Sequence, residues 1–241
     1  MRVLVGIPWR PQPHRVYAYD LTVQRYRDML PDADVVDVDT DHEPFCLAAC
    51  RNRAVRLAEA GGYDVVVLAD ADTLPEREPL TRAINLVTLD ARAGITRVHL
   101  PYTEYRSLRR DGTDQALDGV PLDRCAHVVV PFATSGVYVT TPTAWWASGG
   151  QDERFQGWAP EDMAWLIAHR LLLGSEPARH EGRVYALHHE SPPKTGPTYD
   201  AAVELYQRYV QAGDAGDIEA VRRLVAERAG KLSDPAETMG A

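Results

Sequence analysis

One stretch of the sequence decides the fold: Tyr63-Asp64-Val65-Val66-Val67-Leu68-Ala69-Asp70-Ala71-Asp72-Thr73-Leu74-Pro75. Its apolar run is typical of a strand in the middle of a parallel sheet, covered on both faces. Open α/β sheets bind ligands at the carboxyl ends of their strands, where Asp70 and Asp72 would lie. Two carboxylates at this place are suited to holding Mg²⁺ or Mn²⁺ against the phosphates of a nucleotide.

The Asp-x-Asp spacing is informative here because of where it lies. The same spacing occurs at Asp32/Asp34, Asp37/Asp39 and Asp39/Asp41, but only the pair at 70 and 72 follows a long uncharged apolar run. A calcium-binding loop that begins at Asp37 is excluded, because such a loop needs glycine at its sixth position and glutamate at its twelfth. The chain has His42 and Ala48 there.

Composition narrows the class of protein. The 241 residues, 45% hydrophobic and 25% charged, fit one globular domain with a sizeable core. A net charge of −9 argues against a partner that is a nucleic acid or an anionic membrane surface. The first residues form too short an apolar run for a signal peptide, and no apolar stretch is long enough for a transmembrane segment. We therefore expect a cytoplasmic protein. The three cysteines, Cys46, Cys50 and Cys125, have no metal-type spacing and are interpreted as thiols.

Strands and helices alternate along the chain. We expect strands at 2–8, 34–39, 63–69, 96–101 and 183–188, with one or two more within 126–141. We expect helices at 19–30, 46–60, 78–92, 142–150, 161–173, 199–211 and 217–229. This alternation predicts an α/β protein with a mostly parallel central sheet flanked by helices, in one domain over residues 1–230. Residues 103–124, with Asp111-Gly112 as a turn signal, fit either a mobile excursion over an active site or a plain surface loop, and we favour the plain loop. Residues 231–241 are interpreted as a flexible tail.

A second informative segment is Gly157-Trp158-Ala159-Pro160-Glu161-Asp162. Pro160 suits a first helical position, so both carboxylates would lie in the first turn. Acidic residues there can simply complement the helix dipole. Alternatively, Trp158 stacks on a sugar ring while a carboxylate accepts a hydroxyl proton as general base.

Two further segments carry weaker signals. In Tyr185-Ala186-Leu187-His188-His189-Glu190 the adjacent histidines would point to opposite faces of an extended chain, so only one can face the site. Paired with Asp72, that histidine would form a mixed N/O site suited to Mn²⁺. Ile7-Pro8-Trp9-Arg10 follows the first strand, where an aromatic ring and an arginine can hold a base and a phosphate. Asn52-Arg53 on the next helix is a comparable signal, and Asp39, at the end of the second strand, is a further candidate for nucleotide binding.

Taken in order, these segments resemble the β-1,4-galactosyltransferases, a family of GT-A glycosyltransferases. Ile7-Pro8-Trp9-Arg10 resembles the Ile-Pro-Phe-Arg that opens that family, and Asn52-Arg53-Ala54 resembles its Asn-Arg-Ala helix. Asp70-Ala71-Asp72-Thr73-Leu74-Pro75 is similar to its Asp-Val-Asp-Leu-Ile-Pro. Gly149-Gly150, Phe155, Gly157-Trp158 and Glu161-Asp162 are similar to its Gly-Phe and Gly-Trp-Gly-Gly-Glu-Asp segment, and a histidine follows a later strand. The likeness spans roughly residues 5–190.

The resemblance implies a GT-A fold and transfer of a hexose from a UDP-sugar, with Mn²⁺ or Mg²⁺ as cofactor. The nucleotide-sugar half would be about 1–101 and the acceptor and metal-histidine half about 125–195, followed by helices at about 199–230. Pro8, Trp9, Arg10 and Arg53 would contact the nucleotide, and Asp70 the ribose or sugar, close to the metal. Asp72 would bind the metal with His189, or with His188. Trp158 would line the sugar sites, Glu161 would bind the acceptor, and Asp162 would be the base of an inverting reaction.

The sequence also departs from the family's pattern. Tyr185 or Ala186 holds the place of a metal-binding methionine, and Ala159-Pro160 replaces a Gly-Gly of a moving lid. The acceptor could be a glycan, a protein or a small molecule. Rival hypotheses are a retaining enzyme resembling the polypeptide N-acetylgalactosaminyltransferases, and a non-catalytic module that binds sugar nucleotides or glycans. A nucleotidyltransferase lacks support, because no Gly-rich phosphate loop or lysine motif lies near the first strand. We expect residues 72, 162 and 189 to converge on a single cleft.

Overall fold

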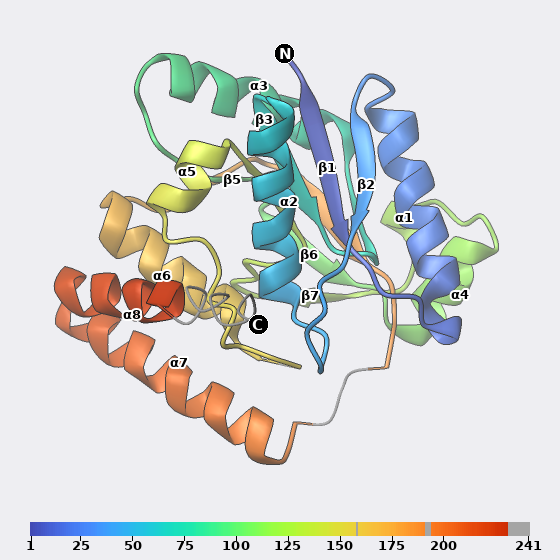
Figure 1. Cartoon of the computed structure of the whole chain (residues 1–241). Helices are drawn as coiled ribbons and strands as arrows, with labels where there is room; N and C mark the ends of the chain where they lie inside the picture. Colours follow the sequence, from blue (N-terminus) through green and yellow to red (C-terminus); the bar gives the residue numbers. More distant parts are fainter. Residues whose placement is uncertain (158, 191–193, 231–241) are drawn as a thin grey trace, which may run out of the picture.

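The computed structural model describes residues 1–157, 159–190 and 194–230 (Figure 1). A six-stranded sheet with the order β2-β1-β3-β8-β5-β9 forms its centre. The strands are β1 (Val3–Pro8), β2 (Asp34–Val38), β3 (Val65–Ala69), β5 (His99–Leu100), β8 (Val137–Thr140) and β9 (Ala178–Arg179). β1, β2 and β3 are parallel, whereas β8 runs antiparallel to both of its neighbours, β3 and β5. The sheet is therefore mixed, with β8 as its reversed strand.

A four-stranded sheet with the order β4-β10-β6-β7 lies beyond the carboxyl end of β3. Its strands are β4 (Thr73–Pro75), β6 (Glu104–Ser107), β7 (Val128–Val130) and β10 (Arg183–Ala186). The turn of Asp70, Ala71 and Asp72 joins β3 to β4 and so connects the two sheets. Both carboxylates of the turn therefore lie at the junction of the sheets.

Helices surround the central sheet. They are α1 (Val16–Met29), α2 (Leu47–Gly61), α3 (Arg77–Arg92), α4 (Arg109–Leu117), α5 (Pro142–Ala147), α6 (Glu161–Leu173), α7 (Pro197–Ala215) and α8 (Ile218–Gly230). Figure 1 shows α2 in front of the strands and α6, α7 and α8 grouped at one side. The residues of β3 are fully buried in the main core, and a second apolar cluster joins α6, α7 and α8.

Helix α2 approaches β1 closely because Gly6 has no side chain. A Cβ atom at Gly6 would lie 2.5 Å from the Cβ of Ala54 on α2. Real Cβ atoms do not come this close, so the glycine sets the distance between strand and helix. This matters for the site, because α2 also carries Arg51 and Asn52, both fully buried.

The predicted α/β class is confirmed, and α6 has the predicted bounds, Glu161–Leu173. The prediction of a plain surface loop over 103–124 is wrong, because β6, α4 and a 3₁₀ turn at Leu122–Arg124 form there. Asp111-Gly112 lies inside α4 and not in a turn. The buried residues of α4 are Gly112 and Thr113, which leave no apolar period in the sequence. The predicted tail at 231–241 lies outside the described residues.

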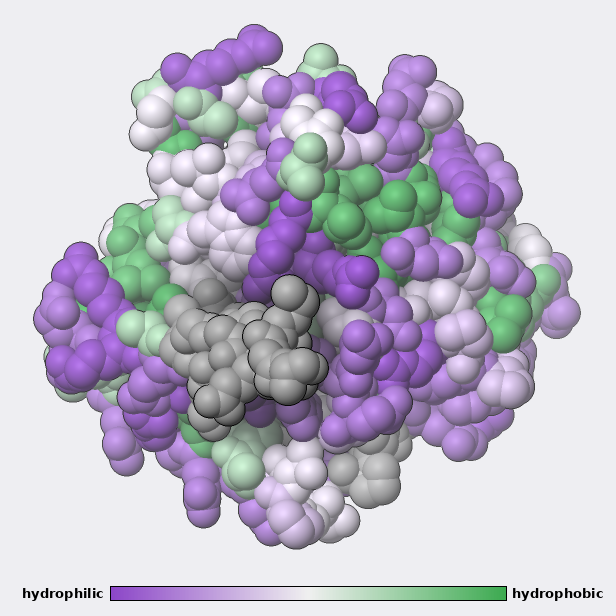
Figure 2. Space-filling view, in the orientation of Figure 1, coloured by the Kyte–Doolittle hydropathy of each residue, from purple (hydrophilic) through white to green (hydrophobic). Residues whose placement is uncertain are grey.

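The surface in Figure 2 is mainly hydrophilic, with apolar residues in separate patches. Within the ranges that the structure describes, no helix combines the length and the apolar character needed to cross a membrane. The cysteines Cys46, Cys50 and Cys125 are buried free thiols.

Candidate active site

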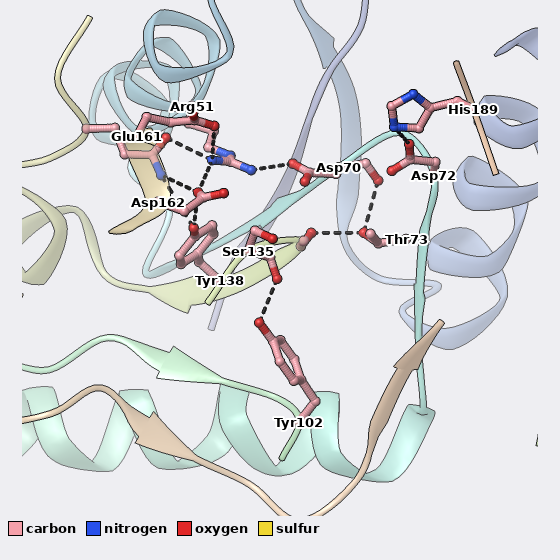
Figure 3. Close-up of polar contacts among 12 residues, drawn as sticks. Arg51, Asp70, Asp72, Thr73, Tyr102, Ser135, Tyr138, Glu161, Asp162 and His189 are labelled. Atoms are coloured by element: carbon pink, nitrogen blue, oxygen red, sulfur yellow. Dashed lines mark hydrogen bonds and ion pairs between the residues drawn. The ribbon is translucent and has the colours of Figure 1, made fainter. Parts of the chain in front are cut away.

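The turn between β3 and β4 directs its two carboxylates to different partners. The backbone N–H of Asp70 donates to the carbonyl of Gly136 at 2.8 Å, and the Thr73 hydroxyl donates to the same carbonyl at 2.9 Å. These bonds fix the turn against the start of β8. Figure 3 shows Asp70 facing Arg51 while Asp72 faces His189.

Strand pairing brings His189 to Asp72. β10 runs antiparallel to β4, with Ala186 opposite Thr73, and the N–H of Leu187 donates to the backbone carbonyl of Asp72 at 2.9 Å. The chain then carries His189 Nε2 to 3.0 Å from Asp72 Oδ2. Of the two candidate histidines, His189 is therefore the one that contacts Asp72.

The backbone of His188 is held from two sides. Its N–H donates to the Thr113 hydroxyl of α4 at 2.7 Å, and its carbonyl accepts the Tyr17 hydroxyl of α1 at 2.6 Å. These two bonds anchor the segment that carries His189. Helix α4, which the sequence pattern does not predict, therefore helps to position the site.

Asp72 has two basic neighbours. Besides His189, Arg15 places Nη2 at 3.0 Å from the same Oδ2 atom. Burial would raise the pKa of Asp72, but the hydrogen bonds and charges of His189 and Arg15 outweigh it and hold the pKa below its ordinary value. The hydrogen bond to Asp72 in turn raises the pKa of His189.

Arg51 connects the other carboxylates. Its side chain is fully buried, with Nη2 2.6 Å from Asp70 Oδ1 and Nη1 2.7 Å from Asp162 Oδ1. Nη1 also lies 3.8 Å from Glu161 Oε1 and donates to Gln151 Oε1 at 2.9 Å. Burial would lower the pKa of Arg51, but the carboxylates raise it above its ordinary value, so the guanidinium stays charged.

Asp162 is held through one oxygen. Its Oδ1 accepts hydrogen bonds from Arg51, from Gln151 Nε2 at 3.0 Å and from the Tyr138 hydroxyl. Oδ2 receives no hydrogen bond from any residue that the structure describes. Three donors thus orient the carboxylate and leave its second oxygen available.

Two other carboxyl groups have raised pKa values. Burial raises the pKa of Asp70 to about 6, with Arg51 opposing the shift and the charges of Asp72 and Asp162 adding to it. Burial also raises the pKa of Glu161 well above its ordinary value, and the neighbouring charge of Asp162 adds to the effect. Burial thus favours the neutral form of Glu161, which can donate a hydrogen bond, whereas three donors hold its neighbour Asp162 as an acceptor.

The candidate nucleotide-binding residues near β1 are mostly engaged within the protein. Arg10 makes a two-pronged ion pair with Asp39, at 2.8 and 3.0 Å, and a second pair with Glu43 at 2.7 Å. The Trp9 ring stacks on Tyr19 with 4.4 Å between centroids, and Pro8 ends β1.

Arg53 is exposed and lines a pocket of about 390 Å³ together with Thr40, Asp41, His42, Ala49, Arg56 and Glu153. This pocket lies between the loop after β2 and one face of α2, whereas Arg51 points from another face of the same helix. The predicted sugar contact, Trp158, lies outside the described residues.

The Asp72–His189 pair fits a divalent cation in its donor chemistry. It supplies one carboxylate oxygen and one imidazole nitrogen, a set suited to Mn²⁺. Neighbouring ligands of an octahedral ion with bonds of about 2.1 Å lie roughly 3 Å apart, as these two atoms do. Among the residues with described placement, no group of three or more His, Cys, Asp and Glu side chains could hold a metal. The protein would thus offer few ligands and leave the remaining positions to phosphate oxygens and water, as is usual for Mg²⁺.

Comparison with solved structures identifies the fold. The catalytic domain of Drosophila β1,4-galactosyltransferase 7, in complex with xylobiose, matches with a TM-score of 0.54 and 14% identity over 83% of this chain and 78% of that one. GalNAc-T7, with UDP, GalNAc and Mn²⁺, matches with a TM-score of 0.52 and 12% identity over 95% of this chain and 55% of that one. The fold is that of the GT-A glycosyltransferases. The chain spans about half the length of GalNAc-T7. No family model and no curated protein matches the sequence.

Several residues of this arrangement were not singled out in the sequence, namely Arg15, Arg51, Tyr138 and Gln151. Arg51 is adjacent to the Asn52-Arg53 signal, but its place among the carboxylates depends on chain segments 19 and 111 residues away. Asn52 itself is structural, because its amide oxygen accepts the Trp145 indole N–H at 2.8 Å. The signal for Arg51 in the sequence was its position next to Asn52-Arg53.

Proposed function

We propose that this protein is an inverting, metal-dependent glycosyltransferase that moves a hexose from a UDP-sugar to an acceptor hydroxyl. The observation that carries the proposal is the single guanidinium of Arg51, which joins the Asp70 carboxylate to the Asp162 carboxylate. Asp70 follows β3 beside the Asp72–His189 pair, and Asp162 lies in the first turn of α6. The Asp72–His189 pair on the donor side and Asp162 as the base would thus be held at a fixed distance and orientation, which a displacement reaction requires.

Asp72 and His189 would hold Mn²⁺ or Mg²⁺, with Asp70 close by on the sugar side. When bound, the ion would supply Lewis-acid stabilisation of the departing diphosphate. Pro8, Trp9, Arg10 and Asp39 would form the nucleotide side of the donor site at the ends of β1 and β2, with Arg53 on α2. Arg10 and Asp39 would act there as a prearranged pair, since they already bind each other.

Asp162 would act as the general base. The acceptor oxygen forms a bond to the anomeric carbon while the bond from that carbon to the diphosphate oxygen breaks. The hydroxyl proton passes to Oδ2 of Asp162, which accepts no hydrogen bond from the described residues, and the nucleoside diphosphate leaves with the bonding electrons. Attack on the face opposite the leaving group inverts the anomeric configuration. Proton removal of this kind contributes about 10²–10⁴ in rate.

Glu161 would bind the acceptor. Because burial raises its pKa and favours its neutral form, it could donate a hydrogen bond to a hydroxyl oxygen while Asp162 accepts. Trp158 would provide a ring for the sugar to stack on. The acceptor would be a glycan, a protein or a small molecule. The proposed site requires only that the acceptor carry a hydroxyl group.

The decisive experiment measures UDP and GDP release over a panel of UDP- and GDP-sugars, with and without Mn²⁺. We expect release from one UDP-hexose that depends on the metal, slowly by hydrolysis and faster with an acceptor. NMR of the product should show the anomeric configuration opposite to that of the donor. Retention would instead favour an enzyme of the N-acetylgalactosaminyltransferase kind, and pyrophosphate from UTP a nucleotidyltransferase. UDP binding without turnover of any sugar would favour a binding module.

The metal site has its own test. Asp72→Ala should abolish Mn²⁺-dependent binding of UDP in calorimetry, because it removes the carboxylate ligand. The matched control is Asp20→Ala on α1, which removes the same group from a surface position. Equal UDP affinity in Asp72→Ala and the control would remove Asp72 from the donor site.

A further inference from the structure

We infer that Arg15 is a further donor-binding residue, which pairs with Asp72 before the cation binds and with the donor diphosphate afterwards. The inference rests on the proposed function and assigns a role to a side chain outside the residues named above. It concerns the order of ionic contacts at the Asp72 carboxylate.

Arg15 lies where a diphosphate-binding residue is needed. It ends the 3₁₀ turn Pro13–Arg15, which follows the carboxyl end of β1 and leads into α1. Its side chain is 23% exposed and places Nη2 at 3.0 Å from Asp72 Oδ2. The guanidinium therefore occupies the border of the proposed metal site.

Most of the hydrogen-bonding capacity of Arg15 is unused. A guanidinium has five N–H donors, and the residues that the structure describes give Arg15 one acceptor, Asp72. Its Nε is buried without a hydrogen-bond partner in the described part of the chain. Arg10, by contrast, is already bound by Asp39, Glu43 and backbone carbonyls. Of these two arginines, Arg15 is the one with donors to spare for an incoming anion.

A cation at Asp72 would compete with Arg15 for one atom. Arg15 and His189 both contact Oδ2, and His189 can remain there as a metal ligand through Nε2. Arg15 cannot coordinate a metal, so it must give up Oδ2 to the ion. A displaced, largely buried guanidinium then needs a new anionic partner.

The diphosphate provides that partner within a short movement. Oxygens that share an ion with Asp72 Oδ2 would lie roughly 3 Å from it, as Arg15 Nη2 does now. Arginine forms short, two-pronged hydrogen bonds with phosphate oxygens, which fits its unused donors. Arg15 would thus weaken binding of the metal ion alone and strengthen binding of the metal ion together with the donor diphosphate.

The test compares Arg15→Gln with wild type and with Arg27→Gln, a matched loss of charge at an exposed position of α1. Binding of Mn²⁺ alone is followed through the electron paramagnetic resonance signal of the free ion, and binding of UDP in saturating Mn²⁺ by calorimetry. In Arg15→Gln we expect Mn²⁺ alone to bind about three- to tenfold more tightly, because its competitor is gone. UDP should bind about tenfold or more weakly, the loss typical of a hydrogen bond to a charged group.

Arg15→Lys provides a second test. Lysine keeps the positive charge but lacks the planar guanidinium that can bind two oxygens at once. It should leave the affinity for Mn²⁺ alone near that of wild type and give an intermediate UDP affinity. If Arg15→Gln matches wild type in both measurements, or weakens both together, the inference is overturned while the proposed function stands. If wild type and Arg27→Gln bind neither Mn²⁺ nor UDP, the proposed function fails, and the inference fails with it.

Discussion

Arg51 is a buried cation, and among the described residues its charge is balanced by the carboxyl groups of Asp70, Glu161 and Asp162. Removing one partner of a buried ion pair leaves the others uncompensated and is strongly destabilising. Here the loss would act on Asp70 and Asp162 together, since one guanidinium binds both. Stability and chemistry are therefore coupled at this residue.

Arg51→Met should lower the free energy of unfolding by about 3–5 kcal/mol, as measured by urea denaturation. Arg51→Lys keeps the charge but cannot bridge two carboxylates in the same way, so we expect a smaller loss of stability together with slower transfer. Arg53→Met, at an exposed position of the same helix, is the stability control and should change unfolding by less than about 0.5 kcal/mol. Equal stability of the two Met variants would contradict this account of Arg51.

Asp162→Asn should reduce kcat by about 10²–10⁴ and leave UDP affinity in Mn²⁺ unchanged, because the amide cannot take a proton. Glu161→Gln is the matched comparison on the neighbouring residue. Since burial favours the neutral form of Glu161, an amide can take over its hydrogen bond, and the loss in kcat should be clearly smaller. Steady-state kinetics and calorimetry check both variants, and near-normal turnover of Asp162→Asn would remove it from the role of base.

Individual residues could be predicted from sequence where an element boundary marked them. Asp72 lies three residues after β3 and Asp162 lies in the first turn of α6, so their places at the ends of elements were predictable. Arg15 and Arg51 carry no such mark in a chain with 24 arginines and 2 lysines. Their partners are 57 and 111 residues away, and only the folded chain brings them together.

At the scale of elements, the contact between β1 and α2 sets the position of Arg51. Gly6→Ala would place a Cβ atom 2.5 Å from that of Ala54 and push the helix away from the strand. We expect a loss of about 1–3 kcal/mol in unfolding free energy, typical of overpacking, and slower transfer because Arg51 moves.

The double variant Gly6→Ala/Ala54→Gly tests the cause. Ala54→Gly alone costs about 1 kcal/mol in a helix, but in the double variant it removes the clash. The double variant should therefore be more stable than the sum of the single changes predicts, by about 1 kcal/mol or more in a double-mutant cycle. Strict additivity would show that the close approach of Gly6 and Ala54 is not the reason why Gly6→Ala destabilises the protein.

The elements themselves were predictable to different degrees. Helix α6, which follows Pro160 and ends before Gly174, has the bounds expected from sequence. Helix α4 was missed, because its buried positions are Gly112 and Thr113 and its contacts are polar and long-range. The reversed direction of β8 depends on pairing with β3 and β5 and has no local signal.

For the whole molecule, buried histidines connect stability to pH. His169 accepts the Val98 N–H through Nε2 and bonds the Ser175 carbonyl through Nδ1, so the folded state holds it neutral. Burial lowers its pKa from 6.5 to about 4. Between these two values the unfolded chain binds more protons than the folded one, so this contribution to stability is present above pH 6.5 and is lost as pH falls toward 4.

Urea denaturation at pH 7 and pH 5 should show this loss in wild type. In His169→Gln the difference between the two pH values should shrink by on the order of 1–2 kcal/mol. His14→Gln, at an exposed position, is the control and should keep the wild-type difference. An unchanged difference in His169→Gln would mean that His169 does not supply this pH dependence.

The turn between β3 and β4 has a consequence for engineering. Asp72 contacts His189 in the segment after β10, whereas Asp70 is connected through Arg51 to Asp162 at the start of α6. On the proposed function, the Asp72 side of this turn binds the donor, and the Asp70 side adjoins the residues that bind the acceptor. The three residues of the turn connect the two sides. Grafting the stretch before α6 from a relative should then reprogram the product while leaving the preferred activated sugar untouched.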